Sequence, residues 1–258
     1  MKALIRADFY RMKTNRTLWG TALALLAIVF ALWGTLVFSI FFGSSPSDAS
    51  LAAKQANDFI RGMAGLGVGF IIFLLVALEV FGNEFTFCTN RNTLSFYANR
   101  KKVYLSHFIV TAVVGLALNF LFVGAGLLLG SIFLSSPTLS VAYVGKFFLR
   151  VFFQIPAYLA TISFIFCLIS HFQNRVSTSL AYLLILGIYT GILQWTASLL
   201  GEKGNWILLL DPISSTALLV QKWGLSIPEI LIATVFFSLL FLMTLFIGTR
   251  LFEKADFT

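Results

Sequence analysis

Residues 177–200 read STSLAYLLILGIYTGILQWTASLL and contain no charged side chain. A helix rises about 1.5 Å per residue, so about 20 apolar residues are needed to cross the hydrocarbon core of a bilayer. The stretch is long enough for this and predicts a transmembrane helix. The polar run His171–Arg175 separates it from another apolar stretch that precedes it.

Five further stretches are equally apolar, lack a central charge and end at polar or turn-forming residues. All six predicted spans are 18–42, 60–81, 108–133, 147–170, 177–200 and 228–251. They predict an all-α integral membrane protein with six transmembrane helices, preceded by residues 1–17 and followed by a short tail, 252–258. Pro156 lies inside the fourth span, where it is expected to kink the helix.

The composition agrees with a membrane protein. Hydrophobic residues make up 59% of the 258 positions and charged residues 11%, against about 25% charged in soluble domains. This excludes a disordered chain and a conventional soluble enzyme. The net charge of +8 is interpreted as a record of membrane orientation rather than as a nucleic-acid surface. Cys88 and Cys167 show no metal-binding or redox spacing.

The positions of Lys and Arg predict the orientation, because these residues are enriched in cytoplasmic segments. Most of them fall before the first span, between the second and third, between the fourth and fifth, and at the carboxyl end. Both termini are therefore expected in the cytoplasm.

The amino-terminal segment 1–17 combines cations with a spaced apolar stripe. Ile5, Phe9 and Met12 recur at helical spacing, whereas Lys2 and Arg6 lie off that stripe. The pattern predicts an amphipathic interfacial helix on the inner leaflet. The alternative is a basic flank that only sets the topology.

Residues 206–225 form another mostly apolar stretch, interrupted by Asp211-Pro212. In a seventh span, this charge and helix break would lie near the bilayer centre. A re-entrant or interfacial hairpin on the outer side fits better, and Trp206, Asp211 and Pro212 are its candidate gating residues.

Motifs for catalysis are absent from the sequence. It contains no P-loop, no HExxH or Cys/His metal cluster and no nucleophile elbow. The two histidines, His107 and His171, are interpreted as polar tips at the membrane interface. Glu79 lies near the cytoplasmic end of the second span, where it either pairs with basic residues of the following loop or reaches toward water.

The cytoplasmic loop from Glu84 to Lys102 carries more information than a simple connection requires. It keeps apolar side chains, Phe87 and Leu94 among them, that would be exposed to water unless they entered a groove on a partner or packed on the membrane interface.

This loop resembles the coupling region of type-2 ABC-transporter permease subunits. That family has an acidic–aromatic pair, a Gly-Thr, a basic–Asn pair and an Arg before the third span. The matching residues here are Glu84, Phe85, Thr89, Arg91, Asn92 and Arg100. Cys88 stands at the family's usual Gly, and Ala98-Asn99 replaces the usual pair of small residues before the Arg.

The resemblance implies a coupling helix between the second and third spans and a permease subunit in the cytoplasmic membrane of a bacterial cell. This subunit would pair with a second permease copy or a homologous permease and dock two cytoplasmic ATPase subunits. ATP and Mg would be bound by those ATPases, and no cofactor by this chain. The expected cargo of the exporter is hydrophobic or amphipathic, such as an antimicrobial peptide or bacteriocin, with drug-like or lipid-like molecules as the alternative. A non-transporting six-span scaffold and an intramembrane hydrolase are competing classes, and no paired catalytic groups support the hydrolase.

Overall fold

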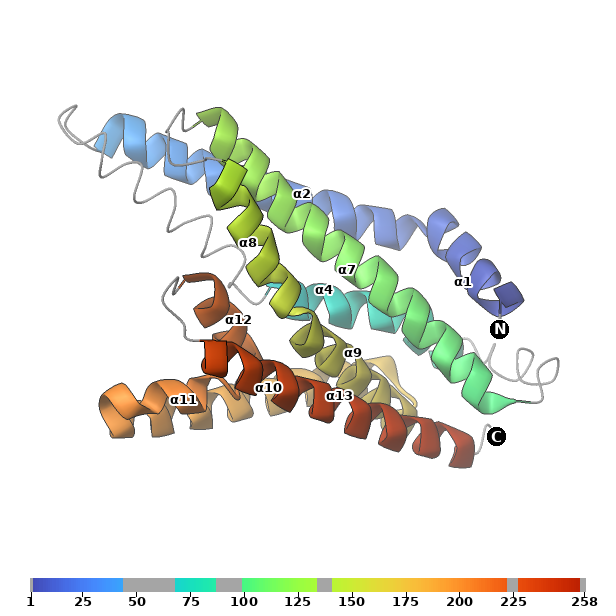
Figure 1. The fold of residues 1–258 in the computed structure, drawn as a ribbon. Helices are drawn as coiled ribbons and strands as arrows, with labels where there is room; N and C mark the ends of the chain where they lie inside the picture. The colour runs from blue at the N-terminus through green and yellow to red at the C-terminus, as the bar shows by residue number, and fades with distance from the viewer. Residues whose placement is uncertain (1, 44–67, 87–98, 134–140, 222–226, 256–258) are drawn as a thin grey trace.

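The structure, a computed structural model, describes residues 2–43, 68–86, 99–133, 141–221 and 227–255. Within these ranges the chain is 95% helical and has no strand. The helices are α1 (Lys2–Thr14), α2 (Arg16–Gly43), α4 (Val68–Ala77), the π-helix η1 (Leu78–Gly82), α5 (Asn83–Thr86), α7 (Arg100–Phe133), α8 (Val141–Phe153), α9 (Ile155–Phe172), α10 (Arg175–Leu200), the 3₁₀ helix η2 (Gly201–Gly204), α11 (Asn205–Leu208), α12 (Pro212–Gln221) and α13 (Ile227–Lys254) (Figure 1).

Four described segments are long and apolar enough to cross a membrane: Arg100–Ala125, Phe148–Phe172, Arg175–Leu200 and Pro228–Lys254. They correspond to the third to sixth predicted spans, which supports a membrane protein. The first predicted span lies within α2. Only the second half of the predicted span 60–81 falls in the described residues, where α4 and η1 cover it. The six-span layout therefore stays a prediction.

Two helices are longer than their predicted spans. α7 begins at Arg100 rather than at residue 108, and α13 continues to Lys254 rather than ending at 251. In both extensions one face is buried: Val103 and Tyr104 in α7, and Phe252 in α13. Residues 252–254 of the predicted tail are thus part of the bundle. Hydropathy marks where a span becomes polar, but a helix continues as long as one face packs.

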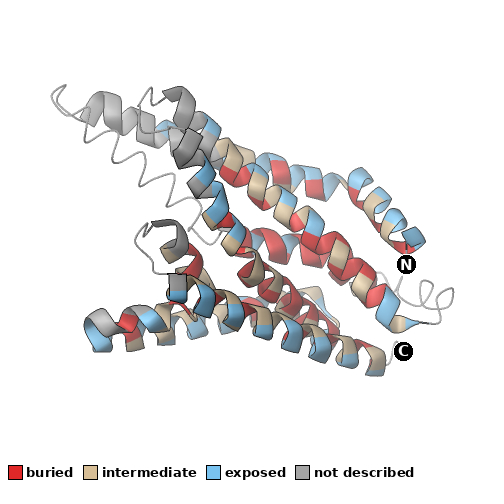
Figure 2. Cartoon of the chain, in the orientation of Figure 1, coloured by how far each residue is buried: buried red, intermediate tan, exposed pale blue. Residues whose placement is uncertain are grey.

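The core is centred on α9, which packs most extensively on α13 and also contacts α4, α10 and α7. Buried residues accordingly gather along α4 and α9 (Figure 2). At one end of the bundle the fully buried ring of Phe81 contacts other rings at centroid distances of 4.8 to 5.8 Å. These rings belong to Phe85, Tyr104, His107, Phe166 and Phe252. The aromatic cluster joins the segments that carry the polar residues described below.

The fourth predicted span is interrupted, as Pro156 predicts. α8 ends at Phe153 and α9 begins at Ile155, because a proline near the start of a helix has no N–H to continue the preceding turn. Between them Gln154 is completely buried. Its Nε2 donates to the carbonyl of Thr216 in α12 at 2.8 Å, and its Oε1 accepts from the Tyr158 hydroxyl at 2.6 Å. The interruption therefore binds α12 to the bundle.

Asp211-Pro212 begins a helix. The buried Asp211 carboxylate accepts from the backbone N–H of Ser214 and from the Thr190 hydroxyl, each at 2.9 Å. Accepting from the third residue of the following helix is the role of an N-cap, and proline is favoured just after it. α11 and α12 are consequently separate helices, and no continuous helix covers the described part of the predicted hairpin, 206–221.

Candidate functional site

The buried face of α1 carries an acidic residue. Leu4, Asp8 and Met12 are buried at successive i, i+4 positions, and α1 packs on α7. The buried face of α1 is therefore shifted by about one residue from the predicted stripe of Ile5, Phe9 and Met12. Ile5 and Phe9 are only half-buried, because they lie beside the face that packs on α7.

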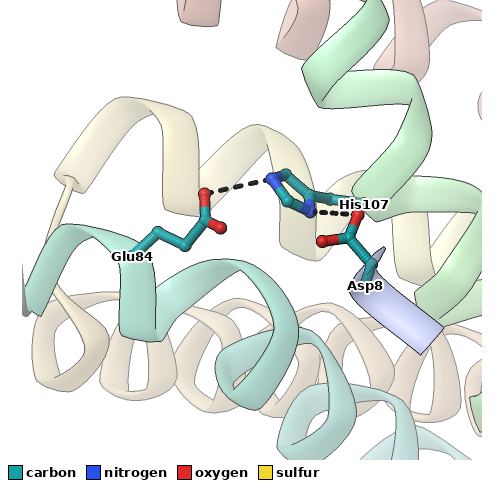
Figure 3. Close-up of side chains that lie close together, drawn as sticks. All are labelled: Asp8, Glu84 and His107. Carbon is teal, nitrogen blue, oxygen red and sulfur yellow. Dashed lines mark ion pairs between the residues drawn. The ribbon is translucent and has the colours of Figure 1, made fainter. Parts of the chain in front are cut away.

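Asp8 faces a buried histidine on α7. His107 is 1% exposed, with Nδ1 3.0 Å from Asp8 Oδ2 and Nε2 3.0 Å from Glu84 Oε2 (Figure 3). The Ser106 hydroxyl donates to the same Asp8 oxygen at 3.0 Å. The interpretation of His107 as a polar tip at the interface is wrong: its ring lies between two carboxylates inside the bundle.

The position of the ring determines its charge. A neutral imidazole has one N–H, so its second nitrogen would direct a lone pair at a carboxylate 3.0 Å away. Two carboxylates on opposite nitrogens therefore favour the imidazolium. The two contacts are ion pairs between the imidazolium and a carboxylate on each side of it.

Arg11 binds to the triad of Asp8, Glu84 and His107, and we call the triad together with Arg11 the triad cluster. Arg11 Nη1 lies 2.9 Å from Glu84 Oε1, and Nη2 donates to the carbonyl of Val80 at 2.8 Å. Val80 belongs to the π-helix η1, and π-helical turns often occur at functional sites. Two carboxylates are balanced by two cations, as buried charges require.

A second polar group lies beside η1. Glu79 Oε1 accepts from Arg175 Nη2 at 2.9 Å, and its Oε2 accepts from the side-chain amides of Asn15 and Asn83 at 3.0 and 2.9 Å. Arg175 also contacts Asn83. Glu79 is thus paired, and its basic partner among the described residues is Arg175, the first residue of α10. Arg91 of the following loop lies outside the described residues. The group joins η1 and α5 to α10 and to the α1–α2 junction.

Arg100, the first residue of α7, contacts the end of α13. Its Nη1 donates to the backbone carbonyls of Glu253 and Ala255 at 2.8 and 2.9 Å, and Lys101 lies 3.4 Å from the Glu253 carboxylate. The last carbonyls of a helix have no partner within it, so a cation there is favourable. Arg100 therefore caps α13.

Asp8, Glu84 and His107 are also residue types that bind metals, and they lie close together. One ligand atom from each residue lies within 4.8 Å of the others, but the two ring nitrogens face carboxylates on opposite sides (Figure 3). A metal ion would need a deprotonated ring nitrogen, so its binding would break one of the two ion pairs of the imidazolium. Arg11 already occupies one oxygen of Glu84. The geometry fits a charge network better than a metal centre.

The residues predicted for ATPase coupling differ in their burial and in the contacts that they make. Glu84 is 1% exposed and its partners lie in this chain, so it is a positioning residue rather than part of a docking surface. Phe85 is half-buried against Phe81 and Phe252. Outside the described residues lie Phe87, Thr89, Arg91, Asn92 and Leu94.

The predicted gating residues lie apart from the triad cluster. Asp211 and Pro212 begin α12, and Trp206 of α11 is exposed. Figure 1 shows α11 and α12 at the end of the bundle opposite to the two termini. Sequence reasoning missed Asp8, Arg11 and His107 as members of one site. The sequence feature that could have indicated this site is Asp8, an acidic residue spaced four positions from both Leu4 and Met12 and therefore on the same face of the helix.

Comparison with known proteins gave no match, either among protein-family models or among curated proteins. The geometry and the loop sequence are therefore the basis of the functional proposal.

The triad cluster predicts acid sensitivity. Burial by itself raises the pKa of Asp8 and of Glu84, but His107 and Arg11 outweigh it and hold both pKa values below their ordinary values of 3.8 and 4.5. As the pH falls past these ordinary values, the two carboxylates bind protons in the unfolded chain but not yet in the folded chain. The free energy of unfolding therefore decreases until the pH has fallen through the lower pKa values of the folded chain.

We expect the thermal midpoint of the purified chain in detergent to drop below about pH 4.5. In the variant Asp8→Asn, Glu84→Gln this acid-induced drop should be smaller. Equal drops in both proteins would mean that these two carboxylates do not cause the acid loss.

Proposed function

We propose that this chain is the membrane subunit of an ATP-driven exporter of the type-2 ABC class. It would work as a dimer, or with a homologous permease, together with two cytoplasmic ATPase subunits that bind ATP and Mg. Its cargo would be hydrophobic or amphipathic, with a membrane-active peptide as the first candidate. The proposed location is a bacterial cytoplasmic membrane, with six spans and both termini in the cytoplasm.

The observation that carries the proposal is the anchoring of both ends of the loop 87–98. Before the loop, Glu84 contacts Arg11 of α1 and His107 of α7. After the loop, Arg100 binds the last carbonyls of α13. A displacement of this loop would therefore be transmitted to α1, α7 and α13 through contacts of charged side chains. A coupling element needs this property.

The clustering of cationic segments supports the proposed orientation. Arg11 joins α1 to α5, Arg175 joins the start of α10 to the adjacent η1, and Arg100 joins the start of α7 to the end of α13. The ion pair of Asp8 with His107 joins α1 to α7. α1, the starts of α7 and α10 and the end of α13 are the segments that the distribution of Lys and Arg assigns to the cytoplasm. They lie together at the end of the bundle where the two termini are found (Figure 1).

A re-entrant outer hairpin is part of the proposal. The Thr190 hydroxyl binds Asp211, and the Tyr189 hydroxyl binds the carbonyl of Leu210. Thr190 precedes the end of α10 by ten residues, or about 15 Å along the helix. If α10 crosses the membrane, the start of α12 lies at that depth, and its backbone is tolerated there because it packs on protein.

The decisive experiment tests the loop. Phe87 and Leu94 lie seven positions apart, on one face if the loop is helical. Burying two such side chains on a partner contributes about 3 to 6 kcal/mol before entropic losses. We expect the variant Phe87→Asp, Leu94→Asp to lose the ATPase during affinity purification from native membranes, while its own membrane level stays normal.

The matched control is Phe87→Leu, Leu94→Met, which keeps both positions apolar and should retain the complex. Mass spectrometry identifies the ATPase by its P-loop, and ATP hydrolysis by the purified complex verifies it. If wild type carries no such ATPase, or if the Asp variant keeps it with transport intact, the coupling assignment is wrong.

A further inference from the structure

A cavity of about 260 Å³ lies between α9, α10 and α13, with Leu210 and Pro212 also in its wall. α10 and α13 both pack on α9 but scarcely contact each other, and the cavity occupies the space between them. Ala160, Thr161 and Phe237 in its wall are buried, whereas Ile185 and Met243 are exposed. The cavity therefore runs from a floor on α9 to a mouth between α10 and α13.

The mouth faces the hydrocarbon core if these helices cross a membrane. The lining residues of α9, α10 and α13 lie near the middle of the three apolar segments Phe148–Phe172, Arg175–Leu200 and Pro228–Lys254. Beside the mouth, exposed apolar side chains continue along both helices, Leu184 on α10 and Leu242 on α13 among them. An occupant would reach the cavity sideways from the bilayer.

The cavity wall offers no free hydroxyl donor to a ligand. The hydroxyls of Thr161, Tyr189 and Thr244 donate to the carbonyls of Ala157, Leu210 and Leu240, at 2.9, 3.1 and 2.8 Å. The Tyr182 hydroxyl lies 3.4 Å from the carbonyl of Phe70. A ligand that accepts hydrogen bonds, such as a carboxylate or a carbonyl, would lose its water contacts here without replacement from these hydroxyls.

The volume limits the size of the occupant. A cavity of about 150 Å³ holds a benzene molecule, so this one suits a single hydrocarbon chain of about ten carbons and is too narrow for a helix about 10 Å wide. We propose that the cavity is a binding site for one acyl chain of a bilayer lipid, which enters between Ile185 and Met243. This site is independent of the proposed ATPase coupling.

The test uses the full-length protein in vesicles of phosphatidylglycerol that contain a phospholipid with a diazirine halfway along one acyl chain. After illumination, mass spectrometry locates the labelled residues. We expect labelling of the cavity wall to saturate as the mole fraction of probe rises. Labelling of the outer faces of α10 and α13, where lipids exchange freely, should increase in proportion.

The blocking variant is Ile185→Trp, Met243→Trp, which places two large rings in the mouth. We expect labelling of the cavity wall to fall at least about tenfold, which corresponds to about 1.4 kcal/mol of binding. The matched control is Leu184→Trp, Leu242→Trp, on the same two helices but outside the cavity, and it should label like wild type. Met243→Trp alone is the fallback if the double variant is poorly expressed.

Labelling of the wall that never saturates, or that is equal in the blocking and control variants, would overturn the proposal. The same holds if a hydrophobic peptide displaces the probe from the wall more effectively than an excess of unlabelled lipid, since the site would then belong to transported cargo. None of these outcomes affects purification of the ATPase complex, so this proposal and the coupling proposal fail separately.

Discussion

His107→Leu is expected to destabilise the chain by about 3 to 5 kcal/mol, the usual loss when one partner of a buried ion pair is removed. The substitution leaves Asp8 and Glu84 buried and deprives both of the ring that separates them. Arg11 still contacts Glu84, but Asp8 keeps only the Ser106 hydroxyl as a hydrogen-bond partner among the described residues. The thermal midpoint in detergent and the membrane level measure the effect.

His171→Leu is the matched control, because His171 is exposed at the end of α9 and its loss should change stability little. A second variant combines His107→Leu with Asp8→Ala and Glu84→Gln. It removes both buried carboxylates and should recover much of the loss, since replacing a whole buried charge group by neutral residues is tolerated better than breaking it. A loss below about 1 kcal/mol in His107→Leu, or no recovery in the triple variant, would contradict the charge network.

The sequence predicted the parts of the fold that depend on local pattern. Stretches 177–200 and 228–251 correspond closely to α10 and α13, because a segment of about 20 apolar residues has few alternatives to a membrane helix. The interruption before Pro156 followed from the missing N–H of proline. Asp211-Pro212 was recognised as a break, and the N-cap pattern was present in the same two residues.

The triad cluster could not be predicted in the same way, because its members are far apart in the chain. Asp8, Glu84 and His107 come from α1, α5 and α7, and only tertiary packing brings them together. His107 follows a run of cations, which resembles the polar end of a span. Hydropathy describes the neighbours of a residue along the chain, whereas the charge of His107 depends on its neighbours in space.

Replacement of Gly248 should have the second large effect. Gly248 is buried in α13, and a Cβ at this position would overlap the Tyr104 hydroxyl oxygen and lie 3.2 Å from Cys167 Cα. The Tyr104 ring has little freedom to move, because it packs against Phe81, Phe166 and Phe252 at centroid distances of 5.6 to 5.8 Å. We expect Gly248→Leu to force α13 away from α7 and α9 and to cost about 3 kcal/mol, at the upper end of overpacking effects.

Gly191→Leu in α10 is the control, because no atom lies within 4 Å of the Cβ position there and an added side chain would meet lipid. Both variants insert the same apolar side chain into an apolar helix, so a difference between their membrane levels or thermal midpoints reports packing rather than hydropathy. Equal behaviour of the two variants would mean that α13 does not approach α7 this closely.

A rescue experiment identifies the atom responsible. In Gly248→Ala the closest contact of the new methyl group is the Tyr104 hydroxyl, and the next are Cys167 Cα and Tyr104 Cζ, each at 3.2 Å. Tyr104→Phe removes that oxygen and leaves the ring in place. The hydroxyl has no hydrogen-bond partner among the described residues, so its removal alone should cost little stability. We therefore expect Tyr104→Phe to restore most of the thermal midpoint lost in Gly248→Ala. If the stability losses of Gly248→Ala and Tyr104→Phe simply add, the new methyl group does not clash with the Tyr104 hydroxyl. The close approach of α13 to the start of α7, where Arg100 contacts the end of α13, would then not be the reason that position 248 requires glycine.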